Sequence, residues 1–514
     1  MKSLALALAI AFASVAVAAP PAPTITVAAS NIRQLQFDIT PVTQVNWYEL
    51  WFKANPGAQW VKYAQTPAQR PIIRINASVH LLDWQQARYF VKACNPGGCS
   101  ASNEVGVDGE QLAAMGYFKP GLPGLNEFFG FQFALSADGM TLVVLANEKI
   151  DHVSGRGAIY VYRKATSSSG WGLDARLLPS PDNPGAGSGS GDDRVAVSSD
   201  GKTIVTSNWV ENDHAGGVYL FRRAADGWHQ TQRITNNTVN DYFGISLKLD
   251  TSAKRLVIEH NAVGDNKREG TLDVYQDLDD GSDQFVYAAT VPTPAFDDPV
   301  WGWCRAFAVS EGGAIVRSCF SGANLNFYTQ VLEASAGTPL QYTEIARLPG
   351  GSGVEVAIDF AGERLLIQGY DEDIYHSNVR IFRRGASGWV KEATLAPLGQ
   401  SGSRAALSGD GKIVAIGMPE DTLAGRGPLF PPYLLGDQTG TVAVYERRAS
   451  GWALRRYVKA GANNYLRSFG TEVALDQYGH VLAVGSPYDP SKATGIDGDR
   501  EDTSAPYRGA VWLY

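Results

Sequence analysis

The sequence predicts an all-β protein in which a small sandwich precedes a seven-bladed β-propeller. Three observations support this prediction. The chain has 514 residues, which is too long for one ordinary domain. Its 55 glycines and 12 tryptophans accompany only 19% charged residues, a composition typical of many short strands joined by tight turns. Most importantly, a strand–turn–strand unit recurs along most of the chain.

The N-terminus has the features of an export signal. Lys2 precedes an apolar run, Leu4–Val17, and small residues up to Ala18 suit cleavage after that position. The run is shorter than the roughly 20 residues that a membrane-spanning helix needs, and no later stretch is long and apolar enough. We therefore expect residues 1–18 to be a signal peptide. The mature chain, without a transmembrane span, would be secreted, periplasmic or at the cell surface; the alternative is an uncleaved anchor.

The four cysteines suit a compartment in which disulfides persist. Cys94 and Cys99 flank an Asn-Pro-Gly-Gly sequence, which predicts a hairpin that brings the two side chains together. Cys304 and Cys319 flank a second predicted turn at equal distances, so they are also directly opposed. We expect these two disulfides; the alternative is four buried free thiols.

The charge balance argues against a nucleic-acid partner. The 44 lysines and arginines are outnumbered by 52 aspartates and glutamates, which gives a net charge of −8. No block of basic residues interrupts this acidic average, whereas nucleic-acid binding needs a basic patch or stripe. The sequence gives no indication of the oligomeric state.

Residues 19–108 predict a two-sheet sandwich. About seven short alternating strands, separated by polar or Pro/Gly turns, fit into this segment. Its last part, from Tyr89 to Val107 (YFVKACNPGGCSASNEVGV), resembles the final hairpin of a fibronectin type III domain. That resemblance implies a spacer or a binding platform. No residues for chemistry are evident in the segment.

The repeated unit is clearest at the end of the chain. It consists of Phe469–Leu475, a turn, Val481–Pro487, a variable loop and Gly509–Tyr514. The same order begins at Phe129, and seven copies occupy residues 109–514. Stacking such sheets around a ring buries the faces that one sheet alone leaves exposed. Several copies add a fourth strand that starts at a tryptophan, namely Trp171, Trp228, Trp389 and Trp452.

The last copy ends at Tyr514 on its third strand and lacks a tryptophan strand of its own. Residues 112–119, which precede the first copy, resemble the fourth strand of the sixth copy, Leu454–Lys459. We expect residues 112–119 to pair with the last blade and close the propeller. The alternative is that residues 111–125 are only a linker.

The Phe-Gly pairs carry a more specific resemblance. Phe469-Gly470 followed by Gly485–Pro487 resembles the FG-GAP repeat of integrin α-chain propellers and their bacterial relatives. Ala415–Asp421 in the sixth copy and Ala493–Asp499 in the seventh support it. The resemblance covers nearly all of residues 109–514. It implies extracellular binding or adhesion to proteins or glycans, Ca²⁺ in some blade loops, and no catalytic activity.

The strongest metal candidate is an acidic loop with Asp497, Asp499, Glu501 and Asp502. Its carboxylates and flexible glycine suit Ca²⁺. However, the spacing departs from the integrin Asp-x-Asp-x-Asp-Gly pattern and an arginine reduces the local charge, so a solvated acidic loop is the alternative. A second acidic run, residues 277–283, stands at a predicted turn in the third copy.

No familiar catalytic motif occurs in the sequence: His-Glu-x-x-His, Gly-x-Ser-x-Gly and the phosphate-binding Gly-Lys-Ser/Thr loop are all missing. The histidines are scattered over different copies, although a propeller can gather distant residues at its axis. Four aromatic residues at predicted loop positions would suit a face that stacks on sugars or clamps a peptide, if they do not pack in the core: Trp209, Trp301, Trp303 and Tyr433.

The favoured interpretation is a non-enzymatic extracellular protein that binds a protein or glycan through the propeller loops. One alternative is an extracellular carbohydrate-active enzyme with acidic residues at the propeller axis. Another is a structural spacer in a surface assembly.

Overall fold

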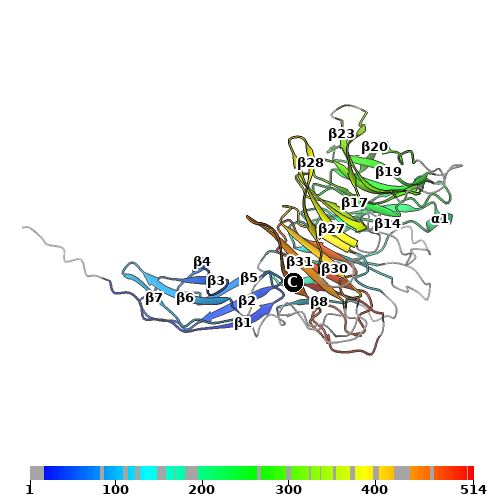
Figure 1. Ribbon diagram of the computed structural model, residues 1–514. Helices are drawn as coiled ribbons and strands as arrows, with labels where there is room; N and C mark the ends of the chain where they lie inside the picture. Colours follow the sequence, from blue (N-terminus) through cyan, green and yellow to red (C-terminus); the bar gives the residue numbers. More distant parts are fainter. Residues whose placement is uncertain are drawn as a thin grey trace, which may run out of the picture. The chain divides into compact units, whose positions relative to one another are not determined.

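The computed structural model (Figure 1) describes residues 17–514 with short gaps. The residues outside the description are 1–16, 82–85, 108–113, 122–127, 148–157, 168, 180–194, 263–267, 280, 297–301, 323–325, 336, 338, 351–354, 371–376, 398–403, 422–439, 463–467 and 506. The described residues contain many strands and almost no helix, which confirms the predicted all-β class. Most of the predicted signal peptide lies outside them. Within them, no helix has the length and apolarity needed to cross a membrane.

The chain divides into two compact units. The first contains residues up to 30, 34–76 and 82–110, and the second contains 31–33, 77–81 and 111–514. The first unit has a three-stranded sheet and a four-stranded sheet. The three-stranded sheet contains β1 (Ile25–Asn31), β2 (Gln34–Ile39) and β5 (Ile72–Asn76). The four-stranded sheet contains β4 (Val61–Pro67), β3 (Trp47–Lys53), β6 (Arg88–Asn95) and β7 (Gly98–Ala101).

Alternating side chains of the first unit form a core between its two sheets. Tyr48 and Leu50 of β3 are fully buried, as is Val91 of β6. The ring of Phe37 on β2 lies 4.9 Å from that of Tyr89 on β6, so the two sheets pack face to face. The first unit is therefore a small sandwich.

The second unit contains seven described antiparallel sheets of four strands each (Figure 1). The first sheet has β9 (Phe133–Leu135), β10 (Thr141–Ala146), β11 (Ala158–Lys164) and β12 (Trp171–Leu177). The second has β13 (Val195–Val197), β14 (Thr203–Asn208), β15 (Gly217–Ala224) and β16 (Gly227–Ile234). The third has β17 (Ser246–Leu249), β18 (Arg255–Ala262), β19 (Arg268–Asp277) and β20 (Phe285–Val291).

The remaining sheets repeat this order. The fourth has β21 (Gly302–Val309), β22 (Ile315–Ser321), β23 (Asn326–Ala334) and β24 (Tyr342–Pro349). The fifth has β25 (Glu355–Ile358), β26 (Arg364–Tyr370), β27 (Ser377–Gly385) and β28 (Gly388–Leu395). The sixth has β29 (Arg404–Leu407), β30 (Ile413–Met418), β31 (Thr441–Arg448) and β32 (Gly451–Val458). The seventh has β33 (Val473–Leu475), β34 (Leu482–Ser486), β35 (Ala510–Leu513) and β8 (Gly116–Phe118).

The seventh sheet combines the two ends of the repeat region. Strand β8 pairs with β35 in the register Val511↔Phe118 and Leu513↔Gly116. Close by, Lys119 Nζ lies 3.1 Å from Asp489 Oδ1, and both side chains are completely buried. An outer strand from residues before the first sheet thus leaves β35 covered on both edges. Residues 112 and 113 of the predicted closing segment lie outside the described residues.

Adjacent sheets share hydrophobic cores. One core joins Val205 and Leu220 of the second sheet to Leu247 and Ile258 of the third. The first strands of successive sheets also contact one another in a complete cycle: β9, β13, β17, β21, β25, β29, β33 and β9 again. Four-stranded sheets packed side by side in a cycle fit a β-propeller.

Short turns between the first and second strands of the sheets link one end of this cycle. At each turn a serine or aspartate accepts the backbone N–H of a residue four or five positions later; Ser408 Oγ, for example, lies 2.9 Å from Ile413 N. The residues in this position are Ser136, Ser198, Asp250, Ser310, Asp359, Ser408 and Asp476. Backbone hydrogen bonds join neighbouring turns, including one of 2.9 Å from Gln477 N to Ala137 O, between the seventh and first sheets. We call this end the turn end.

Both predicted disulfides are present. Cys94 pairs with Cys99 across the β6–β7 hairpin, and Cys304 pairs with Cys319 across β21 and β22. No cysteine is left free. These bonds are compatible with the expected extracellular or periplasmic location.

Candidate binding site at the loop end

Two loops meet at the end opposite the turns, which we call the loop end. One connects β14 to β15 and contains the short helical turn α1 (Glu211–His214). The other connects β16 of the second sheet to β17 of the third. Backbone hydrogen bonds join them: Asn240 N donates to Asp213 O at 3.0 Å, and Tyr242 N donates to His214 O at 2.8 Å. The two loops therefore form one surface across two sheets.

The backbone of both loops is strained. Left-handed φ angles cost free energy for residues other than glycine, and bulky residues adopt them least readily. Three consecutive residues have such angles in the first loop, and three more in the second. They are Asn212 (52°), Asp213 (55°), His214 (60°), Asn237 (57°), Asn240 (60°) and Tyr242 (56°). Strain of this kind is concentrated at functional sites in many proteins.

The strained loops bring three aromatic side chains together, which we call the aromatic cluster. The ring of His214 lies 5.7 Å from that of Trp209 and 5.0 Å from that of Tyr242, nearly parallel to each. Trp209 and Tyr242 lie 5.5 Å apart. All three side chains are partly exposed. Trp209 Nε1 and His214 Nδ1 have no hydrogen-bond partner among the described residues.

A buried acid–histidine group supports the second loop from beneath. Asp241 is 2% exposed, and its Oδ2 lies 2.9 Å from His260 Nδ1 on β18. Asp273 Oδ2 lies 3.6 Å from the other ring nitrogen. Burial alone would lower the pKa of His260, but the two carboxylates outweigh it and raise the pKa to about 9. At neutral pH a charged His260 thus holds Asp241, the neighbour of Tyr242, against the third sheet.

A buried glutamate anchors the first loop. Glu211 is 1% exposed and accepts hydrogen bonds from the Tyr219 hydroxyl and from Arg233 Nη2, the latter at 2.5 Å. Its backbone oxygen accepts from Gly216 N. Asp421 and Asp489 occupy the corresponding loop positions in the sixth and seventh sheets and are also buried. The acid at this position therefore fastens the loop and is not free to bind a ligand.

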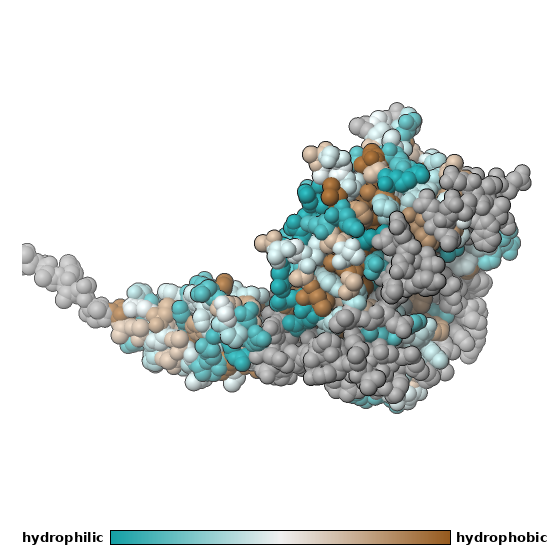
Figure 2. Space-filling model, in the orientation of Figure 1, coloured by the Kyte–Doolittle hydropathy of each residue, from teal (hydrophilic) through white to brown (hydrophobic). Residues whose placement is uncertain are grey.

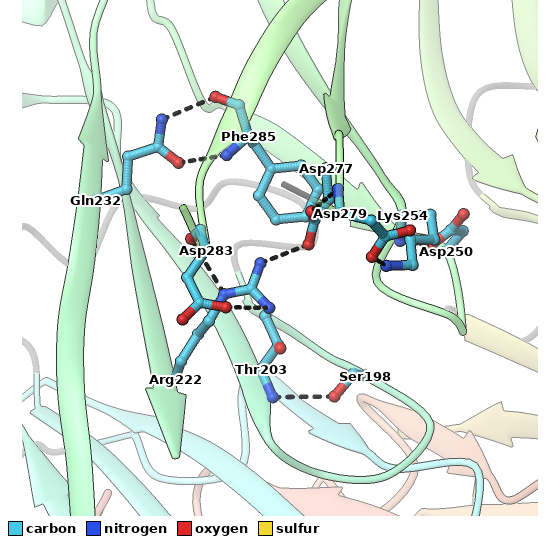
Figure 3. Close-up of polar contacts among 10 residues, drawn as sticks. All are labelled: Ser198, Thr203, Arg222, Gln232, Asp250, Lys254, Asp277, Asp279, Asp283 and Phe285. Atoms are coloured by element: carbon cyan, nitrogen blue, oxygen red, sulfur yellow. Dashed lines mark hydrogen bonds and ion pairs between the residues drawn. The ribbon is translucent and has the colours of Figure 1, made fainter. Parts of the chain in front are cut away.

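The acidic run at 277–283 forms part of the seam between the second and third sheets (Figure 3). Arg222 Nη2 lies 2.9 Å from Asp277 Oδ2 and Arg222 Nη1 lies 3.8 Å from Asp283 Oδ1. Asp279 forms an ion pair with Lys254. In the same view, the Gln232 side chain forms two hydrogen bonds with the backbone of Phe285, both 2.8 Å long. These three acids thus pair with cations instead of gathering around a metal ion.

The predicted calcium residues do not converge on one point. Asp497 Oδ1 accepts the backbone N–H of Tyr117 at 3.0 Å, and burial raises the pKa of Asp497. Asp499 Oδ1 accepts from Glu501 N at 3.0 Å, and Asp502 Oδ2 accepts from the backbone of the same loop. The described residues contain no group of three or more His, Cys, Asp or Glu placed to hold a metal ion. A calcium site at Asp497, Asp499, Glu501 and Asp502 therefore stays a prediction that the arrangement of these side chains does not support.

A cavity of about 230 Å³ lies among the first strands of five sheets, β17, β21, β25, β29 and β33. Alanine, valine, leucine and isoleucine form most of its wall, with Lys248, Glu355 and Glu472 as the charged residues. Arg404 Nη1 lies 2.9 Å from Glu355 Oε2, and Arg404 Nε lies 3.5 Å from Glu472 Oε2. We call this the axial cavity. The two glutamates are 117 positions apart in the sequence, and sequence analysis did not select them.

The structure separates the predicted loop aromatics. Trp209 belongs to the aromatic cluster, whereas Trp303 packs against Phe320, with ring centroids 4.4 Å apart. Trp301 and Tyr433 lie outside the described residues. Sequence analysis missed Tyr242. Its position directly before Phe243-Gly244 could have identified it, because the residue before each Phe-Gly pair lies at the loop end.

No protein-family model and no curated protein matches the sequence. Similar solved structures include β-propeller folds. Sqt1 from Chaetomium thermophilum is 13% identical, with a TM-score of 0.41 over 77% of this chain and 89% of that one. An oligogalacturonate lyase from Vibrio parahaemolyticus is 10% identical, with a TM-score of 0.41 over 78% and 90%. Prolyl oligopeptidase B from Galerina marginata is 10% identical, with a TM-score of 0.43 over 91% of this chain and 55% of that one.

These comparisons correct one expectation and leave two others as predictions. The expectation that the chain is not an enzyme is wrong, because the architecture does not support it: the similar structures include lyases and peptidases. The physical reason is that a cycle of sheets assembles side chains from distant positions, so missing local motifs do not exclude a catalytic site. The resemblances to the FG-GAP and fibronectin type III families are not shown by these comparisons and stay predictions.

Proposed function

We propose that this chain is an extracellular recognition protein that binds a glycan through the aromatic cluster at the loop end. In this proposal residues 1–18 are a signal peptide, residues 19–108 a fibronectin type III-like sandwich, and residues 109–514 a seven-bladed FG-GAP-like propeller closed by residues 112–119. The observation that carries the proposal is the partly exposed group of Trp209, His214 and Tyr242 on a strained backbone.

Aromatic faces pack well against the C–H faces of sugar rings, and tryptophan and tyrosine also offer a polar edge. Trp209 Nε1 and His214 Nδ1 are themselves buried, so the partly exposed rings would bind the sugar by stacking. The buried contacts of Asp241 and Glu211 hold the loops in place before a ligand arrives, which lowers the entropic cost of binding. A rigid platform with few charges suits a glycan better than an ionic ligand.

A glycan array followed by calorimetric titration of the best ligand tests this proposal. The change Trp209→Ala should weaken binding at least tenfold, because it removes one of three stacking surfaces. Tyr478→Ala is the matched control, since Tyr478 is 53% exposed but lies at a turn of the seventh sheet. Binding of a protein but no glycan, or glycan binding that Trp209→Ala leaves unchanged, would contradict the proposal. Neither binding nor turnover would favour a structural spacer.

A second candidate function rests on the axial cavity. Glu355 and Glu472 line it together, and paired carboxylates are the usual catalytic groups of carbohydrate-active enzymes. Arg404 contacts both and would orient them. Incubation with a panel of polysaccharides should then release new reducing ends or unsaturated products, and Glu355→Gln and Glu472→Gln should each abolish that release. Unchanged turnover in both variants would place the chemistry elsewhere.

A further inference from the structure

The outward face of the four-stranded sheet in the first unit carries an unusual set of side chains. Residues of a half-buried strand alternate between core and solvent, and the solvent side is normally polar. On β3, Tyr48 and Leu50 are buried, whereas Trp47, Glu49, Trp51 and Lys53 occupy the other face and are partly exposed. On the neighbouring β6, Phe90 and Lys92 share that outward face. Aromatic and cationic residues thus replace the small polar residues expected there.

The aromatic rings of this face are held in a defined arrangement. Trp51 and Phe90 are parallel, with centroids 6.2 Å apart, and Trp60 meets Phe90 edge-on at 4.5 Å. The indole N–H groups of Trp47 and Trp51 each donate to Glu49, at 3.1 Å. Because Glu49 is shared in this way, the indoles cannot turn freely.

Cations surround these rings. Lys92 Nζ lies 3.9 Å from the centre of Trp51, and Lys53 Nζ lies 4.5 Å from the centre of Trp60. Lys62 Nζ lies 2.6 Å from Glu49 Oε1 on the same face. These are all three lysines of residues 17–107, a segment with seven lysines and arginines against four aspartates and glutamates. The whole chain, by contrast, has a net charge of −8.

Opposite charges on this face are few and already occupied. Glu49 pairs with Lys62 and with the two indoles; burial alone would raise its pKa, but these contacts hold the pKa below its usual value. Glu104 lies 3.8 Å from Lys53 and is 52% exposed. The face therefore presents a surplus of positive charge beside flat aromatic surface. Hydrophilic and hydrophobic residues are interspersed on the side of this unit that Figure 2 displays.

We propose that this face, formed by Trp47, Trp51, Lys53, Trp60, Lys62, Phe90 and Lys92, binds an acidic polysaccharide. Sugar rings would pack on the aromatic side chains, and carboxylate or sulfate groups would pair with the lysines. A neutral glycan would offer no negative charge to the surplus of positive charge on this face. The two disulfides favour an oxidising compartment outside the cytoplasm, where acidic polysaccharides are a more common polyanion than nucleic acids. The site is distinct from the aromatic cluster of the second unit.

Titration of the complete mature chain with alginate, dextran sulfate and uncharged dextran tests the proposal. Alginate or dextran sulfate should bind with an affinity that falls steeply as salt rises, while uncharged dextran should not bind. Lys92→Gln and Lys62→Gln should each reduce the affinity severalfold and weaken its salt dependence. Trp60→Ala should reduce the affinity about tenfold at every salt concentration, in proportion to the lost stacking surface.

Controls separate this site from general charge effects and from the loop end. Arg74→Gln removes one positive charge from an exposed position on β5 of the other sheet and should leave binding unchanged. Trp209→Ala should also leave it unchanged, so the two proposals fail independently. If Trp60→Ala does not fold, the two lysine variants decide. Equal affinity for uncharged dextran, tighter binding of single-stranded DNA, or no response to Lys92→Gln would overturn the proposal.

Discussion

The turn end and the loop end of the second unit use the same seven sheets in opposite ways. At the turn end, each sheet has a serine or aspartate that bonds to its own turn, and backbone hydrogen bonds connect neighbouring turns. At the loop end, the described loops differ in length, and the two loops of the candidate site carry six residues with left-handed φ angles. Of these six, Tyr242 shares its conformation with Phe128 and Ser468, which precede the other two Phe-Gly pairs, and the other five depart from the repeat. The difference shows that repeated residues hold the sheets together, while departures from the repeat mark surfaces available for function.

Part of the loop end is nevertheless repeated. Phe129, Phe243 and Phe469 each form a parallel bridge with a glycine that precedes the third strand of the preceding sheet. These glycines are Gly509, Gly216 and Gly440, each with a φ near 80°. A Cβ on any of them would lie about 2 Å from the carbonyl oxygen of the paired phenylalanine. The Phe-Gly pairs therefore connect neighbouring sheets, and other residues of the loops must recognise a ligand.

The largest effect on stability is expected at the loop between β34 and β35 of the seventh sheet. Asp489→Asn would leave Lys119 charged and buried without its carboxylate partner, which costs about 3–5 kcal/mol of unfolding free energy. Urea denaturation measures this loss. Asp226→Asn, at a 75% exposed side chain, is the control and should leave the stability nearly unchanged. Equal effects of the two substitutions would show that the loop end does not contribute to holding the cycle together.

A pH-dependent effect is expected beneath the aromatic cluster. The pKa of His260 is raised to about 9, above its unfolded value of about 6.5, so its stabilising contribution is complete below pH 6.5. That contribution, at most about 3 kcal/mol, is lost as pH rises through 9. Denaturation at pH 6 and pH 9.5 should reveal the loss, and His260→Gln should remove most of the difference. A wild-type stability that does not fall over this range would contradict the acid–histidine interpretation.

A smaller but uniform effect is expected at the turn end. Ser136→Ala, Ser198→Ala and Ser408→Ala each leave a buried backbone N–H without its acceptor, which costs about 1–3 kcal/mol. Because the turns are alike, the three losses of unfolding free energy should be similar. Ser169→Ala, in an exposed turn, is the control. Widely different losses would indicate that the turns are not equivalent and would weaken the comparison of the two ends.

Local patterns predicted the parts of the fold that repeat. Asp-Gly turns, Phe-Gly pairs and tryptophans at outer strands such as Trp228 each have one physical role, so their spacing reveals the sheets. The facing cysteines followed from hairpin register in the same way. The aromatic face of the sandwich could also have been predicted, because Trp47 and Trp51 are four positions apart on one strand and therefore share a face. The alternation alone does not show which face of the strand packs in the core.

The candidate sites could not be predicted in this way because they join residues that share no local pattern. Trp209 and Tyr242 are 33 positions apart and meet only because the backbones of two loops bond to each other. Glu355 and Glu472 come together only when the first strands of the fifth, sixth and seventh sheets pack. The acidic loop at Asp497 illustrates the reverse case: its composition suggested a metal, but its carboxylates bond to backbone amides.

The smallest effect gives the sharpest comparison of the two ends. Six of the seven turns at the turn end have glycine at the left-handed position, whereas the third sheet has Ala253, with a φ of 55°. Ala253→Gly should therefore stabilise the protein by up to about 1 kcal/mol and leave ligand binding unchanged.

Asp213→Gly relieves the same strain at the loop end, where φ is also 55°, and should stabilise by a similar or smaller amount. It should also weaken ligand binding, because glycine lets the aromatic cluster lose its fixed arrangement. Thermal unfolding and ligand titration of both variants measure the two quantities together. If Asp213→Gly binds as tightly as the unmodified chain, the strain at the loop end does not serve recognition.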